Sequence, residues 1–368
     1  MNLRCGAEKE HPLYYALIMA GGSGTRLWPV SRSHRSKQSL KLIGDRTMFQ
    51  QAVERLSPLF PAEHIFVVTR AEQSKQLSAQ TPALPSCNFI IEPVGRGTAP
   101  AIGLAAIHLQ QRDPQAVMAV LTADHHIMNT ERFRQVLQAA AVLAAQGYLV
   151  TLGIQPSSPA TGFGYIHHGE NLGSTDGFPT FAVERFVEKP GPELALSMVN
   201  SGEYSWNSGM FIWRVDRILE EIERQLPELY AQLREIVASI EKPDYASILD
   251  QVWRQVKKQT IDYGVMEGAR QVCVIPVEMG WADIGSWRSL LELLPKNQNS
   301  NSVSGPTIEI DTHDTLLFGD KRLIAAIGLE GMIVVDTEDA LLICPKERDQ
   351  EVREVIEQLK ASGQGQWL

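Results

Sequence analysis

The chain has 368 residues, of which 44% are hydrophobic, and this length and composition are ordinary for a globular protein of about two or three domains. The 34 Lys and Arg residues and 43 Asp and Glu residues give a net charge of −9, which argues against a general nucleic-acid-binding protein. No apolar run approaches the roughly 20 residues that span a bilayer, and the first residues lack the apolar centre of a signal peptide. We therefore expect a cytoplasmic protein with neither nucleic-acid nor membrane partners.

The first half of the chain alternates apolar runs with helical segments, after residues 1–12, which we expect to be a flexible tail. Unbroken apolar runs are typical of strands that are buried on both faces of a parallel sheet. Such runs lie at 14–20, 65–69, 89–91 and 116–121. Helical patterns lie at 48–59, 99–111 and 130–146, the last with Asn129 or Thr130 as its candidate N-cap. This alternation predicts an α/β sandwich with crossover helices.

The second half changes in composition. Residues 151–190 are rich in Gly, Pro, Ser and aromatic residues and predict short strands and loops, followed by helices over 215–233 and 245–255. After an Asn- and Ser-rich linker at 297–302, short apolar runs separated by turns predict a small all-β appendage, closed by a helix over 350–361. We therefore expect a large α/β domain over 13–296 and a small β domain over 303–368.

A glycine-rich loop, AGGSGTRL at 20–27, directly follows the first predicted strand. A P-loop would need Lys-Ser/Thr after its last glycine, and the dinucleotide fingerprint would need a third glycine where Leu27 stands, so neither motif fits. Backbone N–H groups of glycines after a buried strand nevertheless approach anions closely. Four cations and no acid follow, namely Arg26, Arg32, Arg35 and Lys37. This combination favours a phosphate-binding loop over a solvated basic loop.

Two aspartates are candidate metal ligands. Asp124 comes just after a buried strand, where ligands gather in open α/β sheets, and Asp283 lies between Trp281 and Trp287. Mg²⁺ is commonly held by one or two carboxylates together with substrate phosphates. Each acid alone is more typical of a helix N-cap or a turn, and spacing does not decide whether the two meet. The His125-His126 pair favours structural histidines over a zinc site, because no H-E-x-x-H motif or Cys/His cluster accompanies it.

Polar residues in apolar or glycine-rich surroundings predict a sugar site. They are Glu188 and Lys189 after an apolar pair, Asn207 in WNSGMF, and the segment TGFGY at 161–165. Glu and Asn side chains suit sugar hydroxyls, while aromatic rings and glycine backbone pack on the ring. The alternative for each of these positions is that the residue only stabilises a turn.

Taken in order, these motifs resemble those of the sugar-nucleotide pyrophosphorylases, and specifically the mannose-1-phosphate guanylyltransferases. The resemblance covers about residues 14–290 and rests on an ordered set of segments: GGSGTRLWP at 21–29, Lys37-Gln38, EPVGRGTAPA at 92–101, ADHHI at 123–127, TGFGYI at 161–166, FVEKP at 186–190, WNSGMF at 206–211, TIDYGVME at 260–267 and GWADIGSW at 280–287. The C-terminal segment around VDTEDALLI resembles the small β domain of that family.

The resemblance implies a Rossmann-like nucleotidyltransferase sandwich with a mixed, mainly parallel sheet and a small, left-handed β-helix-like C-terminal domain. It also implies GTP and mannose 1-phosphate as substrates, Mg²⁺ as cofactor and a homodimer. The nucleotide would be bound by Ala20, Gly21, Gly22, Gly24, Thr25, Arg26, Glu92 and Gly95. Arg26 and Lys37 would contact phosphates, Asp124 and Asp283 would bind Mg²⁺, Lys189 would contact the sugar phosphate, and Gly164, Glu188 and Asn207 would contact the mannose.

The chain departs from the family pattern at several positions. Ser36 replaces the usual Pro before the lysine, Ser39 replaces a bulky residue, and Gly97 replaces an Asn. The S-I-D-Y-A-V-M-E-K pattern carries Thr260, Gly264 and Gly268. Two alternatives stay open: another pairing of nucleoside triphosphate and sugar 1-phosphate, or a silent regulatory subunit that senses GDP-mannose. The length leads us to expect one activity, without the isomerase domain of longer relatives.

Overall fold

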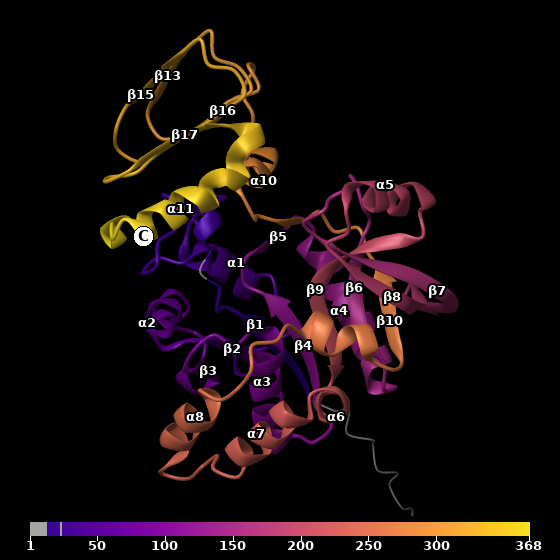
Figure 1. Ribbon diagram of the computed structural model, residues 1–368. Coiled ribbons are helices and arrows are strands. Elements are labelled where there is room, and N and C mark those ends of the chain that lie inside the picture. The colour runs from indigo at the N-terminus through magenta and orange to yellow at the C-terminus, as the bar shows by residue number, and fades with distance from the viewer. Residues whose placement is uncertain (1–12, 23) are drawn as a thin grey trace, which may run out of the picture.

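The computed structural model describes residues 13–22 and 24–368, so the tail predicted at 1–12 lies outside the described residues. A nine-stranded sheet forms the centre of the larger domain (Figure 1). In order across the sheet its strands are β3 (Phe89–Glu92), β2 (Ile65–Arg70), β1 (Tyr14–Met19), β4 (Val117–Thr122), β9 (Tyr204–Arg214), β6 (Leu149–Ile154), β10 (Val272–Pro276), β8 (Phe178–Glu188) and β7 (Gly164–Thr175). Strands β8 and β9 run opposite to the others, so the sheet is mixed and mainly parallel, as expected.

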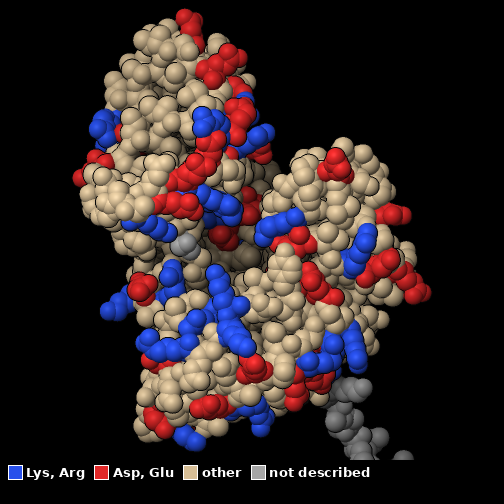
Figure 2. Space-filling view, in the orientation of Figure 1, with Lys and Arg blue, Asp and Glu red and all other residues tan. Residues whose placement is uncertain are grey.

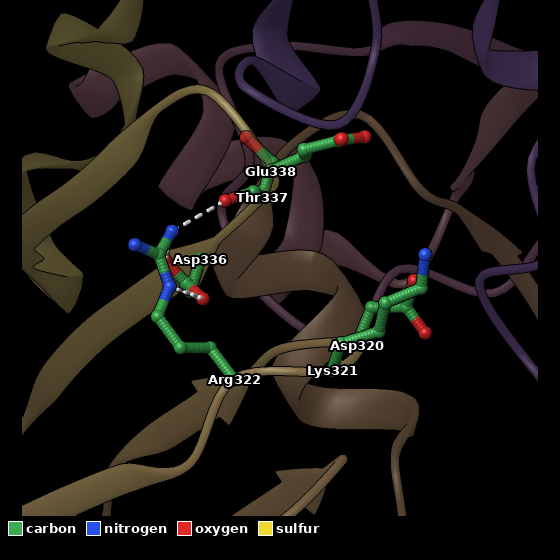
Figure 3. A pocket seen from close by; sticks show the side chains of 6 residues that line it. All are labelled: Asp320, Lys321, Arg322, Asp336, Thr337 and Glu338. Atoms are coloured by element: carbon green, nitrogen blue, oxygen red, sulfur yellow. Dashed lines mark hydrogen bonds and ion pairs between the residues drawn. The ribbon is translucent and has the colours of Figure 1, made fainter.

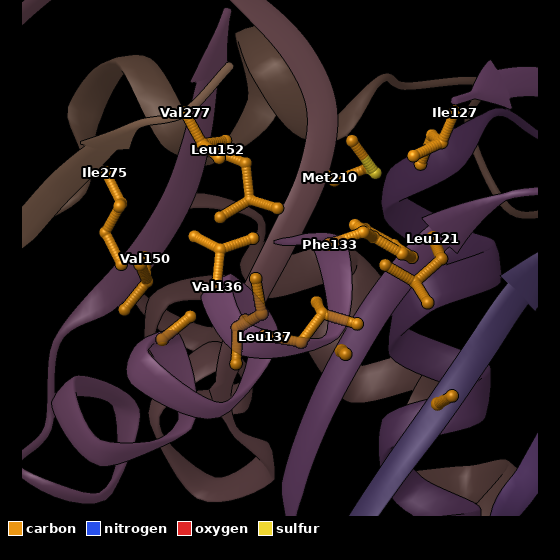
Figure 4. Packing of buried hydrophobic residues seen from close by; sticks show 14 of the residues in the cluster. Leu121, Ile127, Phe133, Val136, Leu137, Val150, Leu152, Met210, Ile275 and Val277 are labelled. Carbon is orange, nitrogen blue, oxygen red and sulfur yellow. The ribbon is translucent and has the colours of Figure 1, made fainter. Parts of the chain in front are cut away.

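Helices cover both faces of this sheet. The described helices are α1 (Met48–Glu54), α2 (Ala71–Gln80), α3 (Thr98–Arg112), α4 (Thr130–Ala145), α5 (Pro192–Ser201), α6 (Val215–Gln225), α7 (Pro227–Val237), α8 (Tyr245–Trp253), α9 (Ile261–Gly264), α10 (Trp287–Leu293) and α11 (Val352–Ala361). Successive residues of β1 enter opposite cores: Ile18 packs in the cluster that contains α4, and Leu17 in the cluster that contains α3. Figure 4 shows the α4 side, where Phe133 and Val136 pack against the sheet. This double burial explains the unbroken apolar runs of the sequence.

The predicted helix over 215–233 is two helices in the structure. α6 ends at Gln225 and α7 begins at Pro227. Proline has no N–H to continue the helical ladder and disfavours helical geometry in the residue before it, and Leu226 accordingly has φ −130° and ψ 57°. The prediction for α4 is confirmed, because the Asn129 side chain accepts a hydrogen bond from the Arg132 N–H as its N-cap.

Residues 151–190 are also more regular than expected. Instead of short strands they contain β7 and β8, strands of 12 and 11 residues that pair antiparallel. The register between them shifts at three points between His167 and Gly173. Each irregularity moves side chains to the other face, which disrupts the alternation from which a long strand is recognised.

The C-terminal region forms the expected small β domain. Its strands are β12 (Ser302–Ser304), β13 (Thr307–Ile310), β14 (Leu316–Phe318), β15 (Ile324–Ile327), β16 (Met332–Asp336) and β17 (Leu341–Pro345). β14 pairs parallel with β12 on one side and with β16 on the other, and β13 pairs parallel with β15, which stacks successive turns of chain as in a β-helix. β17 returns antiparallel along β16 and leads to α11.

The predicted linker at 297–302 is an ordered turn. Asn301 is fully buried, its Nδ2 donates to the Thr312 carbonyl at 2.7 Å, and its Oδ1 accepts from the Thr315 N–H at 2.9 Å. The Asn-rich composition therefore provides hydrogen bonds for the first turn of the β domain rather than flexibility. α10 ends at Leu293 and β12 begins at Ser302, and we retain the division of the chain in this region as a proposal.

The β domain packs directly on the N-terminal part of the chain. α11 contacts the short helical turn Thr25–Leu27, and Leu27, Trp28, Val352 and Ile356 share one apolar cluster. Figure 1 shows α11 between the β domain and the N-terminal elements. In Figure 2 the surface is hollowed between the β domain and the rest of the molecule, with Lys and Arg side chains around the hollow and acidic ones inside it. None of the described helices is long and apolar enough to cross a membrane.

Candidate active site

A short two-stranded sheet brings the two candidate aspartates together. Asp124 follows β4, and the next residues form β5 (His125–Ile127). β5 pairs antiparallel with β11 (Trp281–Asp283), in a register that places Asp283 opposite His125. The two acids are 159 positions apart in the sequence, and this pairing places Asp124, directly before β5, next to Asp283 at the end of β11. The structure therefore shows that the two acids are neighbours, which their spacing in the sequence did not decide.

Lys37 lies between the two carboxylates. Its Nζ is 2.9 Å from Asp124 Oδ2 and 3.3 Å from Asp283 Oδ1, and its side chain is only 5% exposed. Burial by itself would lower the pKa of Lys37, but the charges of the two aspartates outweigh this effect and the pKa is raised. Burial would likewise raise the pKa of Asp124, but the charge of Lys37 outweighs it and the pKa is lowered. Lys37 and Asp124 are therefore both charged at neutral pH.

A cavity of about 250 Å³ opens at this cluster. Its lining is Gly24, Thr25, Arg26, Leu27, Lys37, Asp124, Asp283 and Gly285. Of the four cations in the charge run, Arg26 and Lys37 line it, and these are the two to which the family resemblance assigns the phosphates. Arg32 is buried and directed to the β domain, where its Nη2 pairs with Asp339 at 2.6 Å, while Arg35 is exposed. The phosphate roles of Arg26 and Lys37 stay predictions, and a charge run in the sequence does not indicate the direction of each side chain.

A second cavity of about 180 Å³ shares Asp283 with the first. Its lining is Thr122, His125, Gly162, Phe163, Gly164, Glu188, Asn207, Ser208, Gly209, Asp262, Trp281 and Asp283. Three predicted sugar-binding residues, Gly164, Glu188 and Asn207, therefore converge here from β7, β8 and β9. A Cβ on Gly164 would lie 2.3 Å from Glu188 Oε2, so glycine leaves room for that carboxylate. Lys189 pairs with Glu188 at 2.8 Å, and this bond is the main cause of its raised pKa.

The remaining predicted nucleotide-binding residues lie around the end of β1. Ala20 is buried and its carbonyl accepts from Thr69 Oγ1 at 2.8 Å, and the Gly22 carbonyl accepts from Gln38 Nε2 at 3.0 Å. Glu92 approaches Gly21 so closely that a Cβ there would lie 2.8 Å from Glu92 Oε1. Gly95 is exposed in the bend after β3. These nucleotide-binding roles stay predictions.

Glu92 is a buried carboxylate with an unused oxygen. It is 5% exposed, and its Oε2 has no hydrogen-bond partner. Burial raises its pKa, and the backbone N–H of Arg96 and the charge of Arg70 offset this only in part. A buried polar atom without a partner costs free energy, so this oxygen is suited to accept a hydrogen bond from a ligand.

The donor set fits Mg²⁺ better than zinc. The Asp124 and Asp283 carboxylates both approach Lys37 Nζ, and carboxylate oxygens are the hard ligands that Mg²⁺ prefers. His125 is held structurally, since its Nδ1 accepts from Trp281 Nε1 at 3.0 Å, which agrees with the structural interpretation of this histidine. Within residues 13–22 and 24–368, no group of three or more His, Cys, Asp or Glu side chains forms a metal cage. Trp287, the second tryptophan that flanks Asp283 in the sequence, is fully buried and donates to the Trp28 carbonyl at 2.8 Å.

Comparison with known proteins agrees with this geometry. Residues 15–300 match the family model described as nucleotidyl transferase, which covers more than half of the chain. The chain belongs to the nucleotidyl transferase family. Residues 305–359 match the model described as MannoseP isomerase/GMP-like beta-helix domain, in agreement with the stacked strands of the β domain.

Individual relatives are similar along most of the chain. It is 41% identical over 361 residues to a mannose-1-phosphate guanylyltransferase of Salmonella typhimurium, covering 95% of this chain and 74% of that one. It is 39% identical over 360 residues to one of Klebsiella pneumoniae, covering 95% and 75%. Among solved structures, a Thermus thermophilus protein described as a mannose-1-phosphate geranyltransferase has a TM-score of 0.85 at 33% identity, covering 94% of this chain and 99% of that one.

Four of the departures from the family pattern form two local pairs in the structure. Ser36 and Ser39 are both buried, and Ser39 Oγ donates to the Ser36 carbonyl at 2.8 Å, which braces the turn that begins at Lys37. Gly97 has φ +92°, and a Cβ there would lie 2.3 Å from the Gln259 carbonyl oxygen. A Cβ on Gly264 would lie 2.6 Å from Gln259 Cγ. The two glycines therefore pack on the same residue.

Sequence reasoning missed Asp262, which lines the second cavity. Its Oδ1 accepts from Asn207 Nδ2 at 2.7 Å, and burial raises its pKa against the effect of that hydrogen bond. The sequence contained a signal for it, because Asp262 lies within the segment TIDYGVME and has Ile261 and Tyr263 as its neighbours. It orients the Asn207 amide and presents a further acceptor to the cavity.

Proposed function

We propose that this protein transfers GMP from GTP to mannose 1-phosphate, giving GDP-mannose and pyrophosphate. The observation that supports this most strongly is the arrangement of the two cavities around Asp283. One is lined by glycine backbone, Arg26, Lys37 and two carboxylates, which suits a polyphosphate, and the other by Glu188 and Asn207, which suits a sugar. The relatives named as mannose-1-phosphate guanylyltransferases support the choice of both substrates.

The chemistry requires positioning more than proton transfer. A phosphate oxygen of mannose 1-phosphate attacks the α-phosphorus of GTP, a new P–O bond forms, and the bond to the bridging oxygen breaks. The leaving pyrophosphate takes that electron pair. The nucleophile is already anionic and needs no strong base, so the protein has to hold two anions in line and neutralise charge. Arg26 and Lys37 would bind the phosphates of the nucleotide, and Lys189 that of the sugar.

Asp124 and Asp283 would hold Mg²⁺. When bound, the ion would supply charge neutralisation to the phosphates and orient them. In that state the Lys37 ammonium, now paired with both carboxylates, would be available to a phosphate oxygen. Ala20, Gly21, Gly22, Gly24, Thr25 and Gly95 would present backbone groups to the nucleotide.

Glu92 would recognise the base. An ionised carboxylate only accepts hydrogen bonds, and the pairing edge of guanine presents two adjacent donors, N1–H and the 2-amino group. The unpartnered Oε2 and the raised pKa of Glu92 both indicate a group that gains from such donors.

We place the enzyme in the cytoplasm, where both substrates occur, and propose a homodimer. The exposed isoleucines of β13 and β15 support self-association: Ile308 is 51%, Ile310 49% and Ile327 69% exposed on one two-stranded face. Light scattering after size-exclusion chromatography should give about twice the monomer mass of 40.9 kDa. A monomer at micromolar concentration would contradict this part.

One assay tests the function. Pyrophosphate release is measured over a grid of nucleoside triphosphates and sugar 1-phosphates, with Mg²⁺ and with a chelator. We expect GTP with mannose 1-phosphate to give the highest kcat/KM, and the chelator to abolish turnover. A different preferred pair would identify another sugar nucleotidyltransferase, and binding of GDP-mannose without turnover of any pair would indicate a regulatory subunit.

A further inference from the structure

The loop of residues 24–33, which carries Arg26, is bonded to the C-terminal domain. Trp28 Nε1 donates to the Trp367 carbonyl at 2.7 Å, and Arg32 Nη2 pairs with Asp339 at 2.6 Å. Arg32 Nη1 also donates to the Trp367 carbonyl. Ser33 Oγ donates to the Leu368 carbonyl at 2.8 Å. Three side chains of the loop therefore reach residues more than 300 positions away in the sequence.

Arg32 depends on these partners. Its side chain is 6% exposed, and its Nε donates to the Pro29 carbonyl at 2.6 Å, so the guanidinium is buried with its donors used. A buried charge is costly unless it is paired and hydrogen-bonded. Asp339 supplies the only charge that pairs with Arg32 among the described residues, so the loop conformation and the position of Asp339 are coupled.

Asp339 is presented by a braced turn. The turn joins β16 to β17, and the Ala340 N–H donates to Thr337 Oγ1 at 3.1 Å. On its other side Arg322 pairs with Asp336 through two hydrogen bonds of 3.0 and 2.8 Å and donates to the Thr337 carbonyl (Figure 3). The turn is therefore fixed to the β domain independently of Arg32.

α11 packs against the same loop. Leu27 and Trp28 share an apolar cluster with Val352 and Ile356, and the intervening Arg353 lies close enough to affect Arg26. Burial lowers the pKa of Arg26, and the charge of Arg353 lowers it further. α11 thus adds a second cation beside the one that lines the first cavity.

We propose that the C-terminal domain positions the 24–33 loop for catalysis, with Asp339 as a positioning residue that acts through Arg32. The role assigned to the loop rests on the proposed function, because Arg26 has to meet the phosphates of the bound nucleotide. Without the Asp339 contact the loop has a wider range of conformations, and the binding geometry of Arg26 becomes less populated. Displacement of a group by about 1 Å is enough to slow an enzyme by orders of magnitude.

A matched pair of variants tests this proposal in the full chain. Asp339→Asn removes the charge that pairs with Arg32. Asp314→Asn removes a charge of similar exposure from the same domain, 39% for Asp314 against 46% for Asp339, and Asp314 pairs with Lys346, far along the chain from the loop. Each variant loses one ion pair made by the β domain, so an effect that comes only from a less stable β domain would be seen in both variants. Trp28→Phe is a second route, since it keeps an aromatic ring but removes the bond to Trp367.

Two measurements are made on each variant: deuterium uptake of peptides that cover 24–33, and kcat/KM for GTP. The N–H groups of Trp28, Val30 and Ser31 are hydrogen-bonded within the loop and report on its opening. We expect faster uptake in Asp339→Asn and Trp28→Phe, with kcat/KM lowered at least about threefold, and recovery in Asp339→Glu. Asp314→Asn should match the wild type in both.

The proposal is overturned if Asp339→Asn and Asp314→Asn have the same loop exchange, or if kcat/KM falls in Asp339→Asn without faster exchange. Failure of the proposed function is a separate outcome. A wild-type chain that does not form GDP-mannose would remove the kinetic part, and loop exchange would still decide whether Asp339 holds the loop.

Discussion

Gly24 lies so close to Lys37 that a Cβ at position 24 would be 2.3 Å from Lys37 Cβ. Gly24 also has φ +61°, a left-handed conformation that costs other residues about 1–2 kcal/mol. We predict that Gly24→Ala displaces Lys37 from between Asp124 and Asp283 and lowers kcat/KM by at least about 100-fold. Steady-state kinetics of purified protein checks this.

Gly44→Ala is the matched control for that change. Gly44 has φ +68° but nothing within 4 Å of its Cβ position. It should lose about 1–2 kcal/mol of stability from the same backbone strain, while turnover stays near that of the wild type. Equal activity of the two variants would contradict the role of Gly24 in placing Lys37.

The two aspartates should be required for metal-dependent turnover. Asp283→Asn removes one carboxylate that converges on Lys37 Nζ, so Lys37 keeps Asp124 as a partner and the fold should persist. We predict a loss of kcat of at least about 100-fold, from weaker neutralisation of phosphate charge. Chelation should abolish activity of the wild type, and added Mg²⁺ should restore it. Near-normal pyrophosphate release by Asp283→Asn, with an unchanged Mg²⁺ requirement, would contradict the assignment.

Gly164→Ala should affect the sugar substrate alone. Its new Cβ would lie 2.3 Å from Glu188 Oε2, and the flexible carboxylate would move rather than the backbone. We predict a KM for mannose 1-phosphate that is higher by about 10-fold or more, as for loss of a hydrogen bond to a charged group. The KM for GTP and the melting temperature should change little. Glu188→Gln should act in the same direction, and a parallel rise in both KM values would argue against a sugar site here.

Glu92 should make GTP binding sensitive to acid. Its pKa is raised, so it takes up a proton at a higher pH than an exposed glutamate as the pH falls. The protonated form no longer offers two acceptors to guanine, so binding is complete above the raised pKa and is lost below it. We predict that the KM for GTP rises with falling pH in this range.

Glu92→Gln should remove this limb of the pH profile and weaken the preference for GTP over ATP by about 5- to 150-fold, which corresponds to about 1–3 kcal/mol for a bidentate base contact. Competition between the two nucleotides across pH 4.5 to 8 measures both effects. An unchanged pH profile and preference would show that Glu92 does not contact the base.

Local features of the fold were predictable from the sequence because they depend on neighbouring residues. The unbroken apolar runs predicted β1 to β4, since strands covered on both faces need no polar alternation. The residue types predict Asn129 or Thr130 as the N-cap of α4, and the structure shows that it is Asn129, whose side chain accepts from the N–H three residues ahead. Pro227 also indicates the boundary between α6 and α7, because proline cannot continue a helix, although the helical periodicity on both sides concealed this boundary. The long strands β7 and β8 were missed, because shifts in register obscure their alternation.

The sequence by itself determined which chemistry is present: a glycine-rich loop, two aspartates suited to a metal ion, and polar residues suited to a sugar. Only the tertiary structure decided which of these groups meet. Pairing of β5 with β11 brings Asp283 to Asp124, and an ion pair with Asp339 holds the buried Arg32 side chain away from the cavity that Arg26 and Lys37 line. The physical reason is that strand pairing and the desolvation of buried charges depend on residues distant in sequence, whereas glycine content and charge runs are local.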